Sequence, residues 1–599
     1  MKSLKLITLA LTASMVINSG CKKYLEVEPV SQYSVEQAFS DVSNATTAVL
    51  GAYDELQGDN GYGIRISLYY PYDSDEAIVS GNIDNGRRGI GRYQLQLSNT
   101  ELTNPFNQLY RGLEKANLCI EQIPLMSQYN NGSEAEKKEL RRLHGEALTL
   151  RAQFLFELIR NWGDVPAPMV PSYRQPELFI PQSNRDSTYN KLIADLAVAK
   201  DLVPWRTEVV RNERITKGTV KALRARLALF RGGYSLRTDS RTMERRSDYL
   251  QYYQIARDEC ADLISPVNRT QHTLNPNYEN IWRSLTSFTF DPFGEILFEV
   301  GAGGGNSNSD SRQGQYNGPS INAASRYGQG GGGVLVLPNY FYAFNPLDTR
   351  RDVSITYYAI GATNLKSLRR LGELTDGKFR RDWRNPLLPG TVLNVGYNWP
   401  LIRFSDVLLM FAETENEINN GPTAAAITAF EEVRRRGFRG NEANIGTTPT
   451  DKAGFFNAIV NERYFEFGGE AIRKYDLIRW NMLASKIEET RQKIVQIRDA
   501  VEEYSSVPQY IYWRNNGEEI QFFAPNPFFT PTQAPSPTTG WTRTDWRQHL
   551  LTGATIDNLP LNQGIARFFT PNKSELFPYT TATLQAYAGR LKQNPGYDQ

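Results

Sequence analysis

The chain has 599 residues, of which 40% are hydrophobic, 12% aromatic and 22% charged. This composition excludes a largely disordered chain, and the length is typical of about two to four packed units. The 67 Lys and Arg residues nearly balance the 65 Asp and Glu residues, so the formal charge of +2 gives no reason to expect a nucleic-acid partner. Beyond the leader, no apolar run reaches about 18 residues, so we expect no membrane-spanning helix in the mature chain.

The first 20 residues have the layout of an export signal. Two lysines precede an apolar stretch at 6–17, and the small pair Ser19-Gly20 stands directly before Cys21. This arrangement resembles a bacterial lipobox, although Asn18 occupies a position where an aliphatic residue is usual. Acyl chains on Cys21 would hold a folded body at a bilayer because their methylene groups are buried in it. We therefore predict that residues 1–20 are removed and that Cys21 is lipidated; the alternative is an ordinary signal peptide with a cysteine near its cleavage site.

Helical periodicity dominates the first 265 residues and returns after residue 403. Around 143–159, for example, apolar residues at offsets of 4, 3, 4 and 4 form one stripe. Gly163, Pro166 and Pro168 then oppose continuation of this helix. The spacing predicts helices over roughly 35–57, 105–127, 134–161, 187–203, 216–232, 249–264, 403–418, 423–437 and 451–479. Amphipathic helices joined by short turns cannot bury their apolar faces alone, so we expect them to stack in pairs.

Irregular sequence separates and follows these helices. A strand-like EILFEV at 295–300 leads into a Gly/Asn/Ser tract at 301–333. After residue 480 we predict a loop-rich tail with many proline and aromatic residues. Long irregular segments rich in aromatic residues are more often functional than disordered, so we expect the ligand surface to lie on them.

The sequence offers little material for a cofactor, a metal or a catalytic triad. Gly328, Gly330 and Gly333 form a GxGxxG pattern but lack the preceding strand and following helix of a dinucleotide site. Only three histidines are present, and the stretch NSNSDS lacks the terminal Glu of a calcium loop. We therefore predict no cofactor, no metal and no catalytic residue. A pair of carboxylates for glycoside hydrolysis stays open, because their separation is a spatial property.

Two stretches combine aromatic rings with polar groups in a way that suits sugars. Flat rings can pack on the C–H faces of a sugar, while carboxylate and guanidinium groups bind its hydroxyls. The alternative is that these rings pack against their own scaffold. The predicted ligand-binding residues are Tyr69, Tyr70, Tyr72, Asp73, Asp75, Tyr510, Tyr512, Trp513 and Arg514.

A series of collinear stretches resembles the SusD/RagB family of Bacteroidetes surface lipoproteins. The stretches are CKKYLEVEP at 21–29, EALTLRAQFLFELIRNWGDVPAP at 146–168, RITKGTVKALRARLALFRG at 214–232, LPNYFYAFNPLDTRRD at 337–352, WPLIRFSDVLLMFAETENEI at 399–418, NERYFEFGGEAIRKYDLIRW at 461–480 and PNKSELFPYTTATLQAYAGRLKQNPGY at 571–597. Departures are local: Tyr579-Thr580 stands where the family usually has Ile-Pro, and Tyr464-Phe465 where a second Arg is common.

Charged residues recur at helical spacing within 461–480. They can pair along the helix and across to neighbours, and a buried ion network of this kind specifies how helices dock. We prefer this structural interpretation to a catalytic one. The residues expected in the network are Glu462, Arg463, Glu466, Glu470, Arg473 and Asp476, with Arg403 and Asp406 from the preceding helix.

The resemblance implies a mainly α, SusD-like fold in which tetratricopeptide-like helix pairs form the scaffold, with long irregular loops and little β-strand. It divides the mature chain into an N-terminal helical region at 21–235 and a C-terminal region at 236–599, in which helices within 403–480 complete the scaffold. It also implies a surface-exposed, lipid-anchored outer-membrane protein that binds an oligosaccharide and passes it to a SusC-like TonB-dependent transporter. An oligopeptide ligand is the alternative within the family, and a glycoside hydrolase is a remote alternative from another class.

Overall fold

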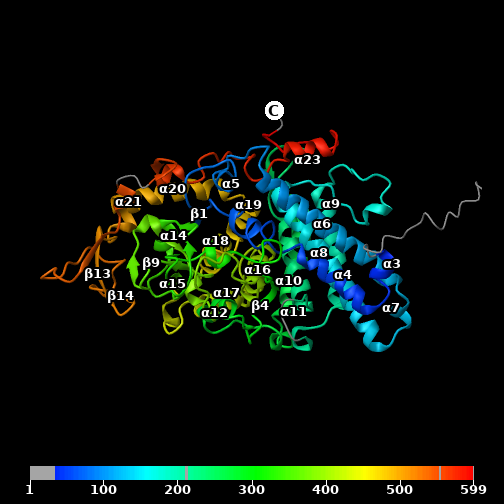
Figure 1. The fold of residues 1–599 in the computed structure, drawn as a ribbon, viewed down its shortest axis with the longest axis horizontal. Coiled ribbons are helices and arrows are strands. Elements are labelled where there is room, and N and C mark those ends of the chain that lie inside the picture. The colour runs from blue at the N-terminus through cyan, green and yellow to red at the C-terminus, as the bar shows by residue number, and fades with distance from the viewer. Residues whose placement is uncertain (1–33, 210–213, 552–554, 598–599) are drawn as a thin grey trace, which may run out of the picture.

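The protein is described by a computed structural model that covers residues 34–209, 214–551 and 555–597 (Figure 1). The predicted leader and Cys21 lie outside these described residues. Within them, no helix is both long enough and apolar enough to cross a membrane.

Long helices build one end of the molecule. α4, α6, α8, α9, α10 and α11 lie together there, and helices next to each other in this order largely pack on one another (Figure 1). Gly112 lets α6 and α8 approach closely, because a Cβ at this position would lie 2.3 Å from the Phe154 ring. The helices are α3 (Val35–Ala38), α4 (Val42–Asp54), α6 (Thr100–Gln122), α8 (Glu134–Trp162), α9 (Arg185–Leu202), α10 (Lys217–Gly232) and α11 (Tyr249–Leu263).

The scaffold continues into the second half of the chain. α11 packs on α16, α16 packs on α17 and α18, and β12 pairs with β4 just before α16. α10, which precedes the predicted boundary at residue 236, packs on α11 and also contacts α16, β12 and β4, so the two regions share one helical scaffold. The elements are β4 (Ile296–Val300), β12 (Trp399–Arg403), α16 (Phe404–Ile418), α17 (Ala424–Gly437), α18 (Lys452–Phe467), α19 (Arg473–Arg479) and α20 (Leu483–Asp499).

The predicted helices are confirmed, with three corrections. The helix expected at 35–57 is divided, because the Asp41 side chain caps a new helix by accepting from Asn44 N at 2.9 Å. The helix expected at 451–479 is interrupted between α18 and α19, where Gly469 has a φ of +80°. The tail after residue 480 is not loop from its start, because α20 forms there and buries Leu483, Ile487, Ile494 and Ile497.

Short strands form small sheets on this scaffold. One has the order β1-β7-β11-β8 and another the order β10-β9-β5-β6. A third sheet, β14-β13-β15, lies at the end of the molecule away from α3, where β13 and β14 are labelled in Figure 1. The strands are β1 (Ala77–Val79), β5 (Ser320–Ile321), β6 (Gly330–Gly331), β7 (Val334–Val336), β8 (Ile355–Thr356), β9 (Tyr358–Ile360), β10 (Lys366–Leu368), β11 (Thr375–Asp376), β13 (Tyr510–Asn516), β14 (Glu519–Phe522) and β15 (Thr542–Asp545).

A buried ion network joins α16, α17 and α18. Arg403 contacts Glu295 at 2.6 Å, Glu466 at 2.8 Å and Glu470 at 2.7 Å, and its side chain is 1% exposed. Arg436 contacts Glu466 at 2.6 Å and Glu295 at 2.9 Å. Carboxylates and guanidinium groups therefore neutralise one another in the buried interior. This arrangement confirms the structural interpretation of the charged residues within 461–480.

Asp406 extends the predicted network toward α10. It contacts Arg463 at 2.6 Å and Arg226 at 2.7 Å. Although burial raises the pKa of Asp406, the two guanidinium groups hold it well below its usual range. The carboxylate is therefore charged in the folded protein at neutral pH.

The last residues of the chain return to the first scaffold helices. Phe577 N donates to Asn161 O at 2.7 Å, and Asn594 Nδ2 donates to Trp162 O at 2.8 Å. α23 (Thr581–Ala586) lies near α6 and α9 in Figure 1. The C-terminal segment thus closes the end of α8, where Trp162 is 1% exposed.

Candidate functional site

The N-terminal group of predicted ligand residues lies in the interior. Tyr69 ends a short π-helix (Arg65–Tyr69) and is 3% exposed, while Tyr70 and Tyr72 are 0% exposed. The Tyr70 ring packs edge-on against Trp162 and Phe577, with centroid distances of 5.9 and 4.8 Å. The prediction that these three rings bind a ligand is therefore wrong, because they bury their faces in the core.

The two aspartates of this group are also structural. Asp73 is 0% exposed and its Oδ1 accepts from Arg92 at 2.9 Å. Asp75 is 4% exposed and binds Arg473 at both carboxylate oxygens, with Oδ1 at 2.9 Å and Oδ2 at 2.6 Å. Each carboxylate thus neutralises a buried guanidinium, which corrects the prediction that they bind sugar hydroxyls. Arg473 belongs to this pair and is not bonded to the Arg403 cluster.

Glu76, the next residue, supports a pH-dependent prediction. Burial and then the neighbouring Asp75 carboxylate raise its pKa from 4.5 to about 8. The unfolded chain loses this proton near pH 4.5 whereas the folded protein keeps it, so this group's contribution to stability is full below pH 4.5 and is lost as the pH rises to about 8. We expect Glu76→Gln to raise the free energy of unfolding near pH 8 by about 2–4 kcal/mol relative to wild type. Urea unfolding of both proteins near pH 4.5 and near pH 8 measures this difference in the free energy of unfolding. An equal difference at the two pH values would contradict a raised pKa for Glu76.

The C-terminal group of predicted residues lies on β13, in the sheet at the end of the molecule. Alternate residues of β13 face opposite sides. Ile511 and Trp513 face inward; Trp513 is 7% exposed and its Nε1 donates to Thr544 Oγ1 at 2.8 Å. Trp513 is therefore part of the core, which corrects its predicted role. Tyr510, Tyr512 and Arg514 are on the outward face, as the prediction for them requires.

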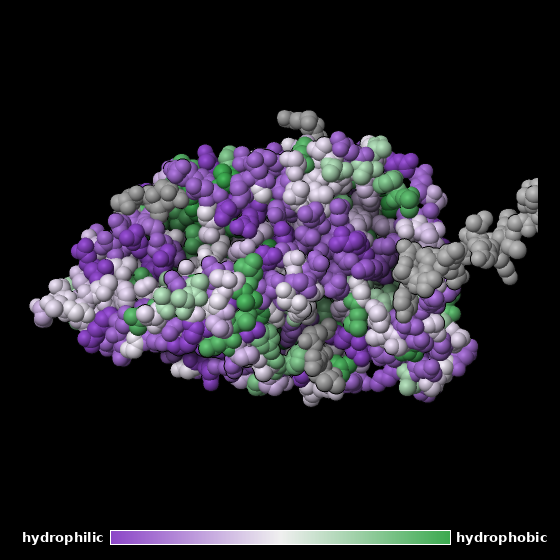
Figure 2. All heavy atoms as spheres, in the orientation of Figure 1, coloured by the Kyte–Doolittle hydropathy of each residue, from purple (hydrophilic) through white to green (hydrophobic). Residues whose placement is uncertain are grey.

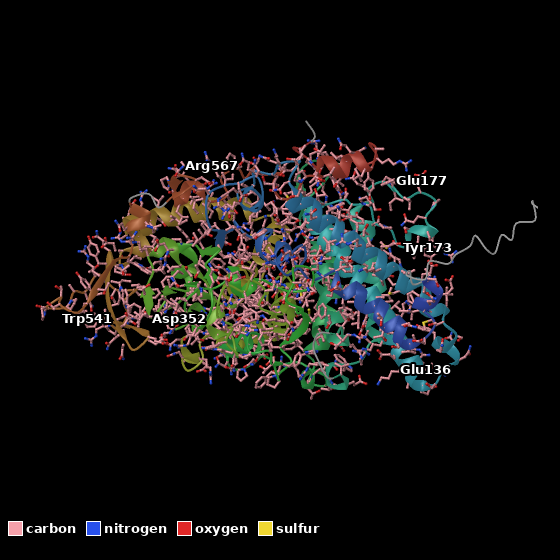
Figure 3. The ribbon with its side chains drawn as sticks, in the orientation of Figure 1. Glu136, Tyr173, Glu177, Asp352, Trp541 and Arg567 are labelled. Atoms are coloured by element: carbon pink, nitrogen blue, oxygen red, sulfur yellow. The ribbon has the colours of Figure 1, made fainter. Side chains whose placement is uncertain are left out.

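Neighbouring strands add further side chains to this outward face. Tyr510 pairs with Asp545, Tyr512 with Arg543, and Arg514 with Gln521. Trp541 lies toward the outer end of the molecule (Figure 3), and the extreme end of the surface is pale in Figure 2. We define the tip platform as Tyr510, Tyr512, Arg514, Gln521, Phe523, Trp541, Arg543 and Asp545.

Guanidinium groups hold two of the platform rings in place. Arg514 Cζ lies 4.6 Å from the Trp541 ring centroid, and Arg543 Cζ lies 4.5 Å from that of Tyr510. Arg514 Nε also donates to Gln521 Oε1 at 2.8 Å. Phe523, which is 39% exposed, packs edge-on against Trp541 with a centroid distance of 5.3 Å. The rings are therefore ordered before any ligand arrives, which reduces the entropy lost on binding.

Two platform groups have unused binding capacity. Within the ranges that the structure describes, no ring or cation stacks on Tyr512 and no hydrogen-bond partner reaches its hydroxyl. Asp545 Oδ1 is buried without a hydrogen-bond partner in the same ranges and lies 3.5 Å from Arg543 Nε. A buried acceptor without a partner is uncommon in folded proteins and is a candidate for bonding to a ligand hydroxyl. The platform can thus offer rings, donors and an acceptor together.

The sequence prediction missed five residues of the platform: Gln521, Phe523, Trp541, Arg543 and Asp545. A signal for them was present, because NNG at 515–517 separates two alternating stretches and so marks a β-hairpin. The alternation in Trp541, Arg543 and Asp545 likewise indicates a strand with one outward face. The linear sequence did not show that these strands pair with β13.

Stacked helices with an exposed aromatic sheet at one end define a helical scaffold protein that presents a ring-lined surface to solvent. Comparison with known families gives the finer class. Residues 294–597 match the model of the SusD family, and residues 23–229 match a model described as starch-binding and associating with the outer membrane. The chain belongs to the SusD family.

Relatives and solved structures agree with this assignment. SusD-like protein P25 of Formosa agariphila is 23% identical over 511 residues, which cover 78% of this chain and 89% of that protein. A SusD homolog from Bacteroides thetaiotaomicron has a TM-score of 0.74 at 23% identity, covering 93% of this chain and 97% of that chain. A laminarin-binding SusD-like protein has a TM-score of 0.63 at 20% identity, covering 93% and 100%. The predicted mainly α, SusD-like fold is confirmed.

Proposed function

We propose that this chain binds glycans at the tip platform without cleaving them. The observation that carries the proposal is the outward face of β13 and its neighbours. There Tyr512, Phe523 and Trp541 accompany Asp545 Oδ1, which has no hydrogen-bond partner within the described ranges. Ring faces suit the apolar C–H faces of sugars, and an acceptor beside the Arg543 guanidinium suits their hydroxyls. Similarity to a laminarin-binding SusD-like protein supports glycan as the ligand class.

Two other functions make different demands. Capture of an extended peptide relies on backbone hydrogen bonds along an open strand or groove, whereas the platform offers side-chain rings and hydroxyl-binding groups. Canonical glycoside hydrolysis relies on two carboxyl groups about 5–10 Å apart. The tip platform as defined contains one carboxylate, Asp545. Both alternatives are therefore outcomes of the experiment below.

Glycan binding is tested by titrating the full mature chain with a panel of hexasaccharides that includes laminarihexaose. We expect Tyr512→Ala and Trp541→Ala each to weaken binding about tenfold, because each removes a ring that the sugar would cover. Tyr173→Ala is the matched control, since Tyr173 is 54% exposed and lies at the other end of the molecule (Figure 3). Thermal melting of each variant separates loss of binding from loss of folding.

The outcomes separate the candidate functions. Affinity for peptides alone would overturn the sugar proposal, and shortened products in the titrated mixture would overturn binding without cleavage. Equal weakening by Tyr173→Ala would show that the tip platform is not the site. Unchanged affinity in both Tyr512→Ala and Trp541→Ala would also show that the tip platform is not the site.

We further propose that lipid on Cys21 anchors the protein in the outer membrane at the cell surface, where it delivers its ligand to a SusC-like TonB-dependent transporter. The lipobox-like leader and the family model described as associating with the outer membrane support this role. We expect Cys21→Ser to move the protein from the membrane fraction to the soluble fraction, because the acyl chains supply its bilayer affinity. Fractionation with Cys119→Ser as control measures this, and a membrane-bound Cys21→Ser protein would contradict lipid anchoring.

A further inference from the structure

A cavity of about 500 Å³ opens between irregular segments of the C-terminal half, away from the β13 sheet. We define it as the loop cavity. Its walls are the turn that follows α12 (Tyr278–Thr286), the loop that follows β4, and the segment 384–398. Small-molecule sites typically enclose about 300–1,000 Å³ and combine apolar side chains with a few placed polar groups. The loop cavity has both the size and the mixture, as the following contacts show.

Phe288 stands at the cavity in an unfavourable backbone conformation. Its φ is +57°, in the left-handed region that a bulky side chain rarely adopts, and its side chain is nevertheless 44% exposed. Arg384 Cζ lies 4.7 Å from the ring centroid, and the Tyr397 ring lies at 6.1 Å. The fold therefore holds a large ring partly in solvent, although neither backbone preference nor core burial favours it. Backbone strain of this kind gathers at ligand sites, where the surrounding structure fixes it.

Polar groups of the cavity are held in fixed positions. Asn398 Nδ2 donates to Glu299 Oε2 at 3.0 Å, and its Oδ1 accepts from Ala302 N at 2.9 Å. Arg384 Nε donates to Val395 O at 3.3 Å. These bonds fix both side chains, so the Arg384 guanidinium and the Asn398 amide each keep one position in the cavity wall.

Asn394 supplies an acceptor that the protein does not use. Its Oδ1 is buried and has no hydrogen-bond partner within the described ranges. Leaving such an acceptor unbonded is costly, so a ligand or water that donates to it is favoured. It lines the same cavity as Phe288. An open ring and an unused acceptor are what a hydroxylated ring compound requires.

The charges of the cavity favour a neutral ligand. Arg384 contributes a positive charge, whereas Asp310 and Glu299 contribute negative ones. Asp310 is occupied by backbone donors, since it accepts from Gly305 N at 2.8 Å and from Gly396 N at 2.9 Å. No excess of positive charge faces the cavity, so a carboxylated or sulfated sugar gains nothing over a neutral one.

We propose that the loop cavity is a second carbohydrate site, which takes a neutral pyranose unit stacked on Phe288 with a hydroxyl donating to Asn394 Oδ1. This inference rests on the proposed glycan-binding function and adds to it a site separate from the tip platform. Two sites on one chain let a long glycan bind with greater avidity than either site alone provides, provided that the glycan spans both.

The test is calorimetric titration of the full mature chain with the hexasaccharide panel used for the platform. Phe288→Gly removes the ring while accepting the φ of +57° without strain, so the variant is expected to fold. Asn394→Ala removes the acceptor. Phe293→Ala is the matched control, because Phe293 is 36% exposed in the same turn but does not line the cavity. A chain that combines Tyr512→Ala with Trp541→Ala isolates the loop cavity from the platform.

We expect two equivalents of a bound hexasaccharide in the wild type and one in Phe288→Gly, with Asn394→Ala weakening that second site at least tenfold. The platform double variant should retain one equivalent, and adding Phe288→Gly to it should abolish binding. One equivalent in the wild type that Phe288→Gly leaves unchanged would overturn the loop-cavity proposal alone. Binding lost in Phe288→Gly but kept in the platform double variant would overturn the platform instead, and absence of binding across the panel would overturn both.

Discussion

Replacing Arg403 with alanine is expected to lower the free energy of unfolding by about 3–5 kcal/mol. The guanidinium of Arg403 contacts Glu295, Glu466 and Glu470 at 2.6–2.8 Å, and all three carboxylates are almost fully buried. Removing it takes from each buried carboxylate one cationic partner that water cannot replace, with Arg436 and Lys378 among the cations that remain to neutralise the cluster. Chemical unfolding followed by circular dichroism measures the loss.

A surface ion pair from the same region is the control for Arg403. Arg435 contacts Glu431 at 2.7 Å along α17, but its side chain is 51% exposed. Exposed pairs contribute about 0–1 kcal/mol, so Arg435→Ala should have little effect. If the two variants lost equal stability, the buried network would not be what docks these helices.

Replacing Asp75 with alanine is the second change with a large expected effect, again about 3–5 kcal/mol in the free energy of unfolding. Asp75 holds Arg473 with both carboxylate oxygens, and Arg473 has a side-chain exposure of 2%. Glycan affinity of the folded fraction should not change, because Asp75 is remote from solvent. Unfolding curves and titrations on the same preparation measure both quantities.

Asp84→Ala is the control for Asp75. Asp84 contacts Arg88 at 2.9 Å and accepts from Gly86 N and Arg88 N, but its side chain is 37% exposed, so its removal should cost only about 1 kcal/mol. A stable Asp75→Ala protein that had lost glycan binding would restore Asp75 to the ligand site. We expect the reverse, in which Asp75→Ala lowers stability and leaves the glycan affinity of the folded fraction unchanged.

The helical scaffold was predictable because its signal is local. Apolar residues three and four positions apart mark α8 and α16, and Ser34 and Gly163 mark where helices begin and end. α20 has the same spacing through Leu483, Ile487 and Ile494, but the proline-rich and aromatic sequence that follows obscured it. Local periodicity is thus sufficient only where the flanking sequence agrees with it.

The candidate site was predictable only in part because its signal is not local. Asp75 and Arg473 are 398 positions apart, so nothing near Asp75 distinguishes a buried ion partner from a sugar-binding carboxylate. A stretch of tyrosine and aspartate residues looks the same in the sequence whether it is buried in the core or binds a sugar. Tyr510, Tyr512 and Arg514 remain candidates because alternation in β13 brings them to one outward face, while Trp513 lies between them and faces inward. Trp541 and Arg543 complete that face only through strand pairing across a long loop.

The return of the C-terminal segment to α8 determines when the protein can finish folding. Phe577 and Asn594 bond to the backbone of Asn161 and Trp162, and Phe577 also packs on Tyr70. A polypeptide that crosses a membrane starting from its N-terminus therefore carries its first helices into the next compartment long before their last contacts arrive. During that interval the surface around Trp162 is open, so the proposed export of this chain requires that its early helices be kept from aggregating until the final residues emerge.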